Sequence, residues 1–266
     1  MGEDVAGGPV LARSLGAVTI LTLNRPASLN SIDQTMAEGF QAALQAVAED
    51  GACRCLVVTG AGRSFCSGQA LPGPGSEEEL PADIAGLLRD RYVPIITGLR
   101  ALMIPVVAAV NGIATGAGLS LALAADLRVA SQTAWFSCGF SKLGLVPDAG
   151  ATYFLPRVLG LPQALRFALT GDRLSADEAH HLGMVARVYP PDRFESQFLE
   201  FAQGLASGPT AAFGRTKQAL NLSLESSLQV QLELEAGLQQ ASTLTEDFRE
   251  GMQAFSERRA PRFRGR

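Results

Sequence analysis

The feature that most constrains the fold is a glycine-rich turn that leads into a long apolar stretch. From 110 to 130 the chain reads VNGIATGAGLSLALAADLRVA, and its first charged residue is Asp126. Three glycines fall within seven positions of this segment: Gly112, Gly116 and Gly118. Glycine costs roughly 0.5–1 kcal/mol relative to alanine inside a helix, so its place at the threshold of an apolar helix needs a physical reason. The pattern predicts a strand, a tight turn, and an apolar helix whose first N–H groups have no partner within the helix.

Two interpretations of the glycine run stay open at this level. A Walker-type phosphate loop is excluded because no Gly-Lys-Ser or Gly-Lys-Thr follows the run. A dinucleotide-binding fingerprint is disfavoured by the glycine spacing and by the mid-chain position. The glycines therefore either let the helix pack closely on a strand or let an oxygen that carries negative charge approach the helix start.

The composition provides ample apolar material for a core. Of the 266 residues 47% are hydrophobic, which suits one large domain or one domain with a smaller appendage. The net charge is −4 and the charges are scattered, so no basic surface for nucleic acid is expected. The N-terminus lacks the pattern of a signal peptide, and no apolar run approaches the length of a membrane span. We therefore expect a cytoplasmic protein without nucleic-acid or membrane partners.

The cysteines and histidines predict neither a disulfide framework nor a metal site. Reduced thiols are expected at all four cysteines, which are Cys53, Cys55, Cys66 and Cys138. The two histidines are neighbours at 180 and 181, and no cluster of metal ligands surrounds them in the sequence.

Apolar periodicity divides the chain into two parts. Strands are predicted at 18–23, 54–59, 105–110, 127–130 and 135–136. Helices are predicted between them, at 152–159, at 163–169, at 175–181 behind the capping box of Ser175 and Glu178, and from a capping box at 31–34 to about Asp50. A surface loop is expected at 71–83. After Pro190 the pattern predicts only helices, at 194–206, 210–222, 228–240 and 246–259. The alternation predicts an α/β fold, and we place a core at 1–197 and a helical region at 198–266.

Five segments in order carry a family resemblance. They are LTLNRPASLNS (21–31), GAGRSFCSG (60–68), AAVNGIATGAG (108–118), GFSKLGLVPDAGATYFLPRVLG (139–160) and FREGMQAFSERRAPRF (248–263). Together they resemble the crotonase, or enoyl-CoA hydratase/isomerase, superfamily over almost the whole chain. The resemblance implies a spiral of ββα units followed by a C-terminal helical trimerisation region, with trimers often paired into hexamers.

The resemblance also assigns binding roles. It implies that the main-chain N–H groups of Gln69 and Ala117 form an oxyanion hole for the enolate of a CoA thioester. Small residues around them would let the thioester oxygen approach, which gives the glycines a purpose. Coenzyme A enters as part of the substrate, no other cofactor is implied, and the implied CoA-binding residues are Arg25, Ala27, Ser67, Gly68, Ala70 and Leu71, with Phe255 and Arg258 supplied by a neighbouring subunit.

One carboxylate remains where the family's hydratases use two. At the two positions where those enzymes hold glutamate, this chain has Ser120 and Phe140, and neither side chain can act as a carboxylate. Asp148 is the remaining candidate, and a single carboxylate suffices for an allylic proton shift. An acyl pocket is expected around Gly116, Ser120, Phe140, Leu143 and Val146.

The sequence allows two interpretations of Asp148. It could merely cap a helix that begins near Ala149, where the helix dipole would lower its pKa. Burial near Phe140, Leu143 and Val146 would instead raise the pKa by a larger amount. A dry pocket therefore favours a catalytic base.

Within the family, the motifs look most like members that isomerise the ring epoxide 2-(1,2-epoxy-1,2-dihydrophenyl)acetyl-CoA in phenylacetate breakdown. One departure is Ala70, where those members have aspartate. We expect an acyl-CoA isomerase that uses Asp148. An atypical hydratase, CoA-ester lyase or hydrolase that holds a water at Ser120 is the second hypothesis, and a non-catalytic acyl-CoA-binding protein is the third.

Overall fold

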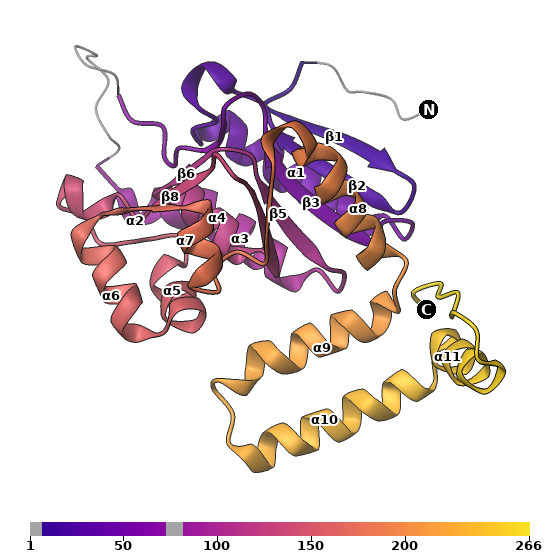
Figure 1. Ribbon diagram of the computed structural model, residues 1–266. Coiled ribbons are helices and arrows are strands. Elements are labelled where there is room, and N and C mark those ends of the chain that lie inside the picture. Colours follow the sequence, from indigo (N-terminus) through magenta and orange to yellow (C-terminus); the bar gives the residue numbers. More distant parts are fainter. Residues whose placement is uncertain (1–6, 73–81) are drawn as a thin grey trace.

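The computed structural model describes residues 7–72 and 82–266, and two sheets organise the fold (Figure 1). Most of the loop predicted at 71–83 lies outside the described residues. The 6-stranded sheet has the order β1 (Val10–Leu15), β2 (Val18–Leu23), β3 (Cys55–Gly60), β5 (Val106–Val110), β7 (Leu127–Ser131), β10 (Arg187–Tyr189). The 4-stranded sheet has the order β4 (Ser64–Cys66), β6 (Ile113–Thr115), β8 (Trp135–Ser137), β9 (Arg173–Ser175).

The chain passes repeatedly from the large sheet to the small sheet and then into a helix. The helices of this part are α1 (Gln34–Glu49), α2 (Ile84–Leu87), α3 (Val93–Ala101), α4 (Ala117–Ala124), α5 (Ala151–Leu159), α6 (Leu161–Thr170), α7 (Ala176–His181) and α8 (Phe194–Ala206). The pairs β3–β4, β5–β6 and β7–β8 each begin one turn of the spiral. Their first strands pair in parallel in the large sheet, and their second strands pair in parallel in the small sheet. The predicted α/β fold of ββα units is confirmed.

Alternating side chains bury the large sheet on both faces. Along β2, Leu21 and Leu23 pack into the core formed with α1, α3 and α4. Val18 and Ile20 point to the opposite face, where Phe194 and other residues of α8 cover them. A strand covered on both faces favours apolar residues on both sides, which explains why Val18 and Ile20 as well as Leu21 and Leu23 are aliphatic.

The predicted division at 197/198 falls inside α8. This helix packs its buried residues on the large sheet, so a boundary there would cut an element of the core. The division into two regions stays a prediction.

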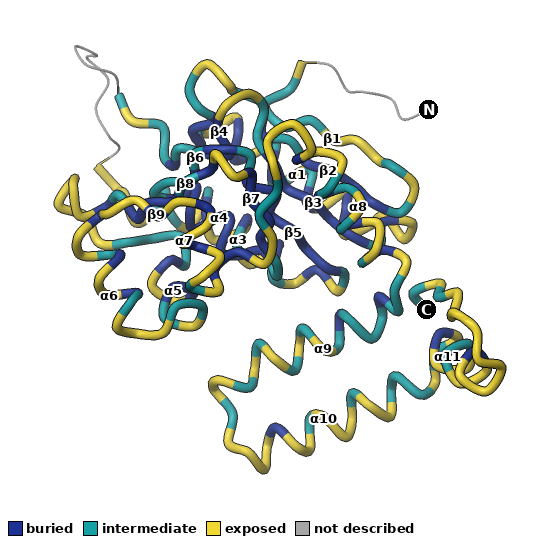
Figure 2. Tube along the Cα trace, in the orientation of Figure 1, coloured by how far each residue is buried: buried dark blue, intermediate teal, exposed yellow. Residues whose placement is uncertain are grey.

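The last three helices extend away from the sheets (Figure 1). They are α9 (Thr210–Ser223), α10 (Leu228–Thr243) and α11 (Glu246–Glu257). Figure 2 shows mostly half-buried residues along α9 and mostly exposed residues along α10. Their exposed apolar side chains include Leu220, Leu222, Leu228, Val230 and Leu232.

Two capping predictions have opposite outcomes. The box at Ser175 and Glu178 is confirmed, since Ser175 accepts from the Glu178 N–H and Glu178 reaches back to the Ser175 N–H. The box predicted at 31–34 is wrong, because α1 is capped by Asp33, whose carboxylate accepts from the Met36 N–H at 2.9 Å. Ser31 lies in the buried loop before the helix.

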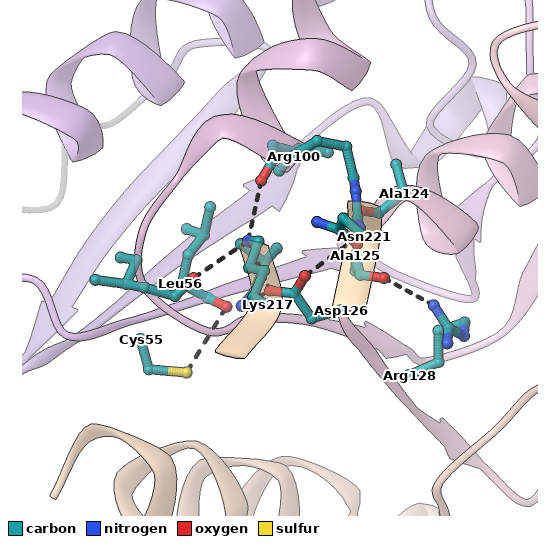
Figure 3. Close-up of polar contacts among 12 residues, drawn as sticks. Cys55, Leu56, Arg100, Ala124, Ala125, Asp126, Arg128, Lys217 and Asn221 are labelled. Carbon is teal, nitrogen blue, oxygen red and sulfur yellow. Dashed lines mark hydrogen bonds and ion pairs between the residues drawn. The ribbon is translucent and has the colours of Figure 1, made fainter. Parts of the chain in front are cut away.

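A largely buried ion cluster joins α9 to the core (Figure 3). Asp126, just after α4, accepts from Lys217 at 2.8 Å and from Arg100 at 3.2 Å. Its second oxygen also accepts from the main-chain N–H of Val106 at 2.9 Å. Arg100 in turn contacts Asn221 of α9. Burial lowers the pKa of Lys217, and the charge of Asp126 opposes that effect. One carboxylate therefore links α3, β5 and α9.

All four cysteines are buried and free of disulfides. Burial raises the pKa of Cys66 to about 12, so its thiol stays protonated. Within the ranges 7–72 and 82–266, the structure contains no helix of sufficient length and apolarity to cross a membrane.

Candidate active site

The glycine run brings β4 against the start of α4. A Cβ atom at Gly118 would lie 2.2 Å from the Cys66 carbonyl oxygen, so only glycine allows this approach. Gly68, with φ of +97°, also approaches closely, since its Cβ would be 3.0 Å from the Thr115 oxygen and 3.1 Å from the Ala117 nitrogen. Gly68, which directly precedes Gln69, therefore contacts the first turn of α4.

The two amides assigned to the oxyanion hole are free of protein partners. Among the described residues, neither the N–H of Gln69 nor that of Ala117 donates a hydrogen bond to another group. The flanking groups of Gln69 are used, because Ile32 donates to the Gly68 carbonyl at 2.7 Å and the Ala70 N–H donates to the Ile32 carbonyl at 2.9 Å. A Cβ at Gly116 would meet nothing within 4 Å, so the helix start faces open space. The geometry is compatible with two donors that serve a ligand.

Two residues with left-handed backbone separate Asp148 from the start of α5. Ala149 has φ of +48° and Gly150 has φ of +86°, and the helix begins only at Ala151. Gly150, not Asp148, occupies the N-cap position, so the interpretation of Asp148 as a plain helix cap is wrong. Its main-chain oxygen accepts from the Ser120 hydroxyl at 2.9 Å.

Asp148 is half-buried at this turn. Its Oδ1 atom is buried without a hydrogen bond within the described residues. Burial raises the pKa of Asp148 to about 6. Of the three residues expected to bury it, Phe140 is buried, whereas Leu143 and Val146 are 60% and 73% exposed. The place of Leu143 and Val146 in an acyl pocket stays a prediction.

Tyr92 and Cys138 are the neighbours that the sequence did not reveal. Burial raises the pKa of the Cys138 thiol to about 11, and the charge of Asp148 adds to the effect. Burial also raises the pKa of Tyr92, with smaller contributions from Cys66 and Asp148. The Tyr92 hydroxyl donates to Gln69 Oε1 at 2.8 Å, which links it to the residue of the first amide. No motif marks Tyr92 in the sequence, because its partner comes from a segment 23 positions away.

Six of the predicted CoA-binding residues come from two segments, 25–31 and 67–71, that are hydrogen-bonded to each other. The Ser67 N–H donates to the Leu29 carbonyl at 3.0 Å, and that of Ala70 is also used, so these two donors are not free. Arg25 donates to the Ser31 carbonyl and pairs with Asp33 at 2.8 Å. Of the other three, Ala27 and Leu71 are exposed and Gly68 is buried. CoA binding by these two segments stays a prediction.

Phe255 and Arg258 lie elsewhere in the chain. They belong to the end of α11, which Figure 1 places apart from β6 and α4. Phe255 is 84% exposed. One chain therefore does not bring these two residues to Gln69.

The chain is similar to known proteins over nearly its whole length. A family model described as enoyl-CoA hydratase/isomerase matches residues 13–266. A probable enoyl-CoA hydratase of Rhodobacter capsulatus is 43% identical, with 94% of this chain and 95% of that protein covered. The 1,2-epoxyphenylacetyl-CoA isomerase of Escherichia coli is 41% identical, with 97% and 98% covered. The crystal structure of an enoyl-CoA hydratase from Bacillus anthracis superposes with a TM-score of 0.90 at 31% identity, with 97% and 100% covered. The chain belongs to the enoyl-CoA hydratase/isomerase, or crotonase, family and is an enzyme that acts on CoA thioesters.

Proposed function

We propose that the protein is an acyl-CoA isomerase that uses Asp148 as its single acid and base. The observation that carries the proposal is the buried, unpartnered Oδ1 of Asp148, whose main chain is bonded to the first turns of α4. A carboxylate without a partner in a desolvated site is held ready to take a proton.

The reaction would proceed through an enolate. Asp148 takes a proton from the carbon next to the thioester carbonyl, and the electron pair moves onto the carbonyl oxygen. The N–H groups of Gln69 and Ala117 stabilise that oxygen, each by about 2.7–4 kcal/mol if they act as typical oxyanion-hole donors. Asp148 then returns the proton at the far carbon of the allylic system. A pKa of about 6 suits both steps near neutral pH.

The substrate proposal rests on one relative and on two absent carboxylates. The Escherichia coli relative is named a 1,2-epoxyphenylacetyl-CoA isomerase, and we propose the same ring epoxide or a 3-enoyl-CoA for this chain. A relative named a probable enoyl-CoA hydratase is equally similar at 43% identity, and one named 2,3-dehydroadipyl-CoA hydratase is 36% identical. Ser120 and Phe140 favour isomerisation, because a hydratase would need a group to activate water.

The test compares wild type with Asp148→Asn on both thioesters. Conjugated products are followed by ultraviolet absorbance, and binding is measured separately by calorimetry. We expect turnover to fall roughly 1,000-fold, with thioester affinity retained. The control is Asp172→Asn, on an exposed residue paired with Arg166. An Asn variant with near-parental turnover contradicts the mechanism.

A water-using reaction is the second candidate, supported by the hydratase names of several relatives. Ser120 would have to hold the water, yet its hydroxyl already contacts the carbonyls of Gly116 and Asp148. Labelled oxygen from solvent in the product would favour this reaction. Tight thioester binding without any turnover would instead favour a binding protein.

We also propose that subunits associate as trimers or hexamers. The exposed apolar residues of α9 and α10 and the 84% exposed Phe255 support it. In such an assembly, Phe255 and Arg258 would contact the CoA moiety bound by a neighbour. Light scattering measures the mass, and Phe255→Ala is expected to raise KM more than it lowers kcat.

A further inference from the structure

We propose that Tyr92 is a positioning residue for the thioester chemistry, and that it acts by holding the side chain of Gln69 so that the main-chain N–H of Gln69 keeps its direction. This inference rests on the proposed function, because it concerns one of the two amides that would receive the thioester oxygen.

The Gln69 side chain is held at both ends of its carboxamide. The buried Tyr92 hydroxyl donates to Oε1 at 2.8 Å. The Nε2 atom donates to the carbonyl of Ala70 at 3.0 Å. Both polar ends of the side chain are therefore engaged, and its conformation is coupled to that of the peptide group next to it.

Tyr92 is itself fixed by an unusual turn. Residues Leu88–Tyr92 form a π-helical turn between α2 and α3. Such turns are rare in proteins, and those that occur often lie at functional sites. The turn is tied to α1, because Gln41 donates to the carbonyls of Asp90 and Arg91 at 2.9 and 3.2 Å.

These contacts close a ring around Gln69. Its neighbours Gly68 and Ala70 are bonded to Ile32, which precedes Asp33, the N-cap residue of α1. The same helix anchors the turn that carries Tyr92, and Tyr92 returns to the Gln69 side chain. The ring uses the polar groups that flank the Gln69 N–H but leaves that N–H without a partner among the described residues. Such an arrangement orients a donor without occupying it.

The Tyr92 hydroxyl also keeps its proton over the working pH range. Burial raises the pKa of Tyr92, and the nearby charge of Asp148 acts in the same direction. The hydroxyl therefore donates to Gln69 whether Asp148 is charged or neutral. Loss of the hydroxyl would leave Gln69 Oε1 without its donor and free the carboxamide to turn.

The experiment is a double-mutant cycle of Tyr92→Phe and Gln69→Met. Phenylalanine keeps the ring in its buried site, and methionine keeps the length of the side chain without its acceptor. We expect each single variant to lower kcat roughly 10-fold with KM changed less than about two-fold. The double variant should be no slower than the slower single variant. Tyr153→Phe is the matched control, since its hydroxyl donates to Glu225 at 3.0 Å on the exposed surface.

A second readout does not depend on turnover. The thioester 4-(dimethylamino)cinnamoyl-CoA absorbs at longer wavelength when donors polarise its carbonyl. We expect a red shift on binding to wild type and to Tyr153→Phe, and a clearly smaller shift with Tyr92→Phe at equal saturation. A role in stability alone would lower the melting temperature and leave the red shift unchanged.

The outcomes separate this inference from the proposed isomerase activity. An inactive wild type that still gives the red shift, reduced in Tyr92→Phe, removes the isomerase and supports the positioning role. Equal red shifts in wild type and Tyr92→Phe, or additive losses of kcat in the cycle, overturn the positioning role. Absence of any shift with wild type overturns the oxyanion hole and, with it, the role of Tyr92.

Discussion

The hydroxyl of Ser120 donates a 2.9 Å hydrogen bond to the main-chain carbonyl of Asp148. Ser120 lies one turn into α4, and its own N–H is bonded to the Gly116 carbonyl at 3.1 Å. Asp148, the proposed base, is therefore attached to the helix whose first N–H belongs to the candidate oxyanion hole. Ser120 stands at a position where the family resemblance implies a glutamate in hydratases, and here it contacts the backbone of Asp148.

Removal of this bond should slow catalysis without abolishing it. A neutral hydrogen bond contributes about 1 kcal/mol, and Ser120→Ala is expected to lower kcat roughly five-fold if that energy is lost in the transition state. Steady-state kinetics with a saturating thioester give the value. Ser137→Ala is the control, because its buried hydroxyl also donates to a main-chain carbonyl, that of Gly171, at 3.3 Å. Equal losses in the two variants would argue against a specific role.

The rate should depend on the protonation of Asp148. Its pKa is about 6, and only the carboxylate can remove a proton. We therefore expect kcat/KM to rise about ten-fold per pH unit below pH 6 and to level off above pH 7. A pH–rate profile between pH 4.5 and 8.5 checks the curve. A flat profile across pH 6 is incompatible with Asp148 as the base.

The same residue should make the protein less stable at neutral pH. Burial raises the folded-state pKa of Asp148 from 3.8 to about 6, so the folded protein binds this proton more tightly than the unfolded chain. Its stabilising effect is complete below the unfolded value of 3.8, and it is lost as the pH rises through about 6. Asp148→Asn should therefore melt at a higher temperature than wild type at pH 7.5, and the difference should vanish below pH 4. Thermal unfolding at the two pH values measures it, and a variant that is less stable at pH 7.5 contradicts the sign.

The ion cluster below α4 should matter more than any surface pair. Asp126→Asn leaves Lys217 and Arg100 without their shared carboxylate in a largely buried site. Removing one partner of a buried pair costs about 3–5 kcal/mol, and we expect a loss of this size in urea unfolding. The exposed pair of Arg166 and Asp172 is the control, since such pairs contribute about 0–1 kcal/mol. Similar losses for Asp126→Asn and Asp172→Asn would show that the cluster is too well solvated to act as a buried pair.

Long elements with strong periodicity could be predicted from the sequence. β2 and α8 have the predicted bounds, because apolar spacing and flanking breakers define them locally. The short strands β4 and β9 were missed, since three residues carry too little periodicity and pair with segments far along the chain. The helix cap at Asp33 instead of Ser31 reflects the same limit, because the sequence offers two acceptors and the fold selects one.

The site was partly predictable for a similar reason. Gln69, Ala117 and Asp148 lie in motifs that are continuous in the sequence, and motif reasoning found them. Tyr92 lies in no motif, and only the packed structure brings it to Gln69. The exposure of Val146 could not be predicted from the sequence either. An apolar residue in a loop has the same sequence pattern whether its neighbours cover it or not.

All eight residues of α4 are buried, from the free amide at its start to the ion cluster that follows its end. A helix enclosed on every side has no room to slide or tilt when substrates of different length arrive. Discrimination among acyl chains must then arise in the segments around the candidate active site, while α4 keeps the same position for every substrate.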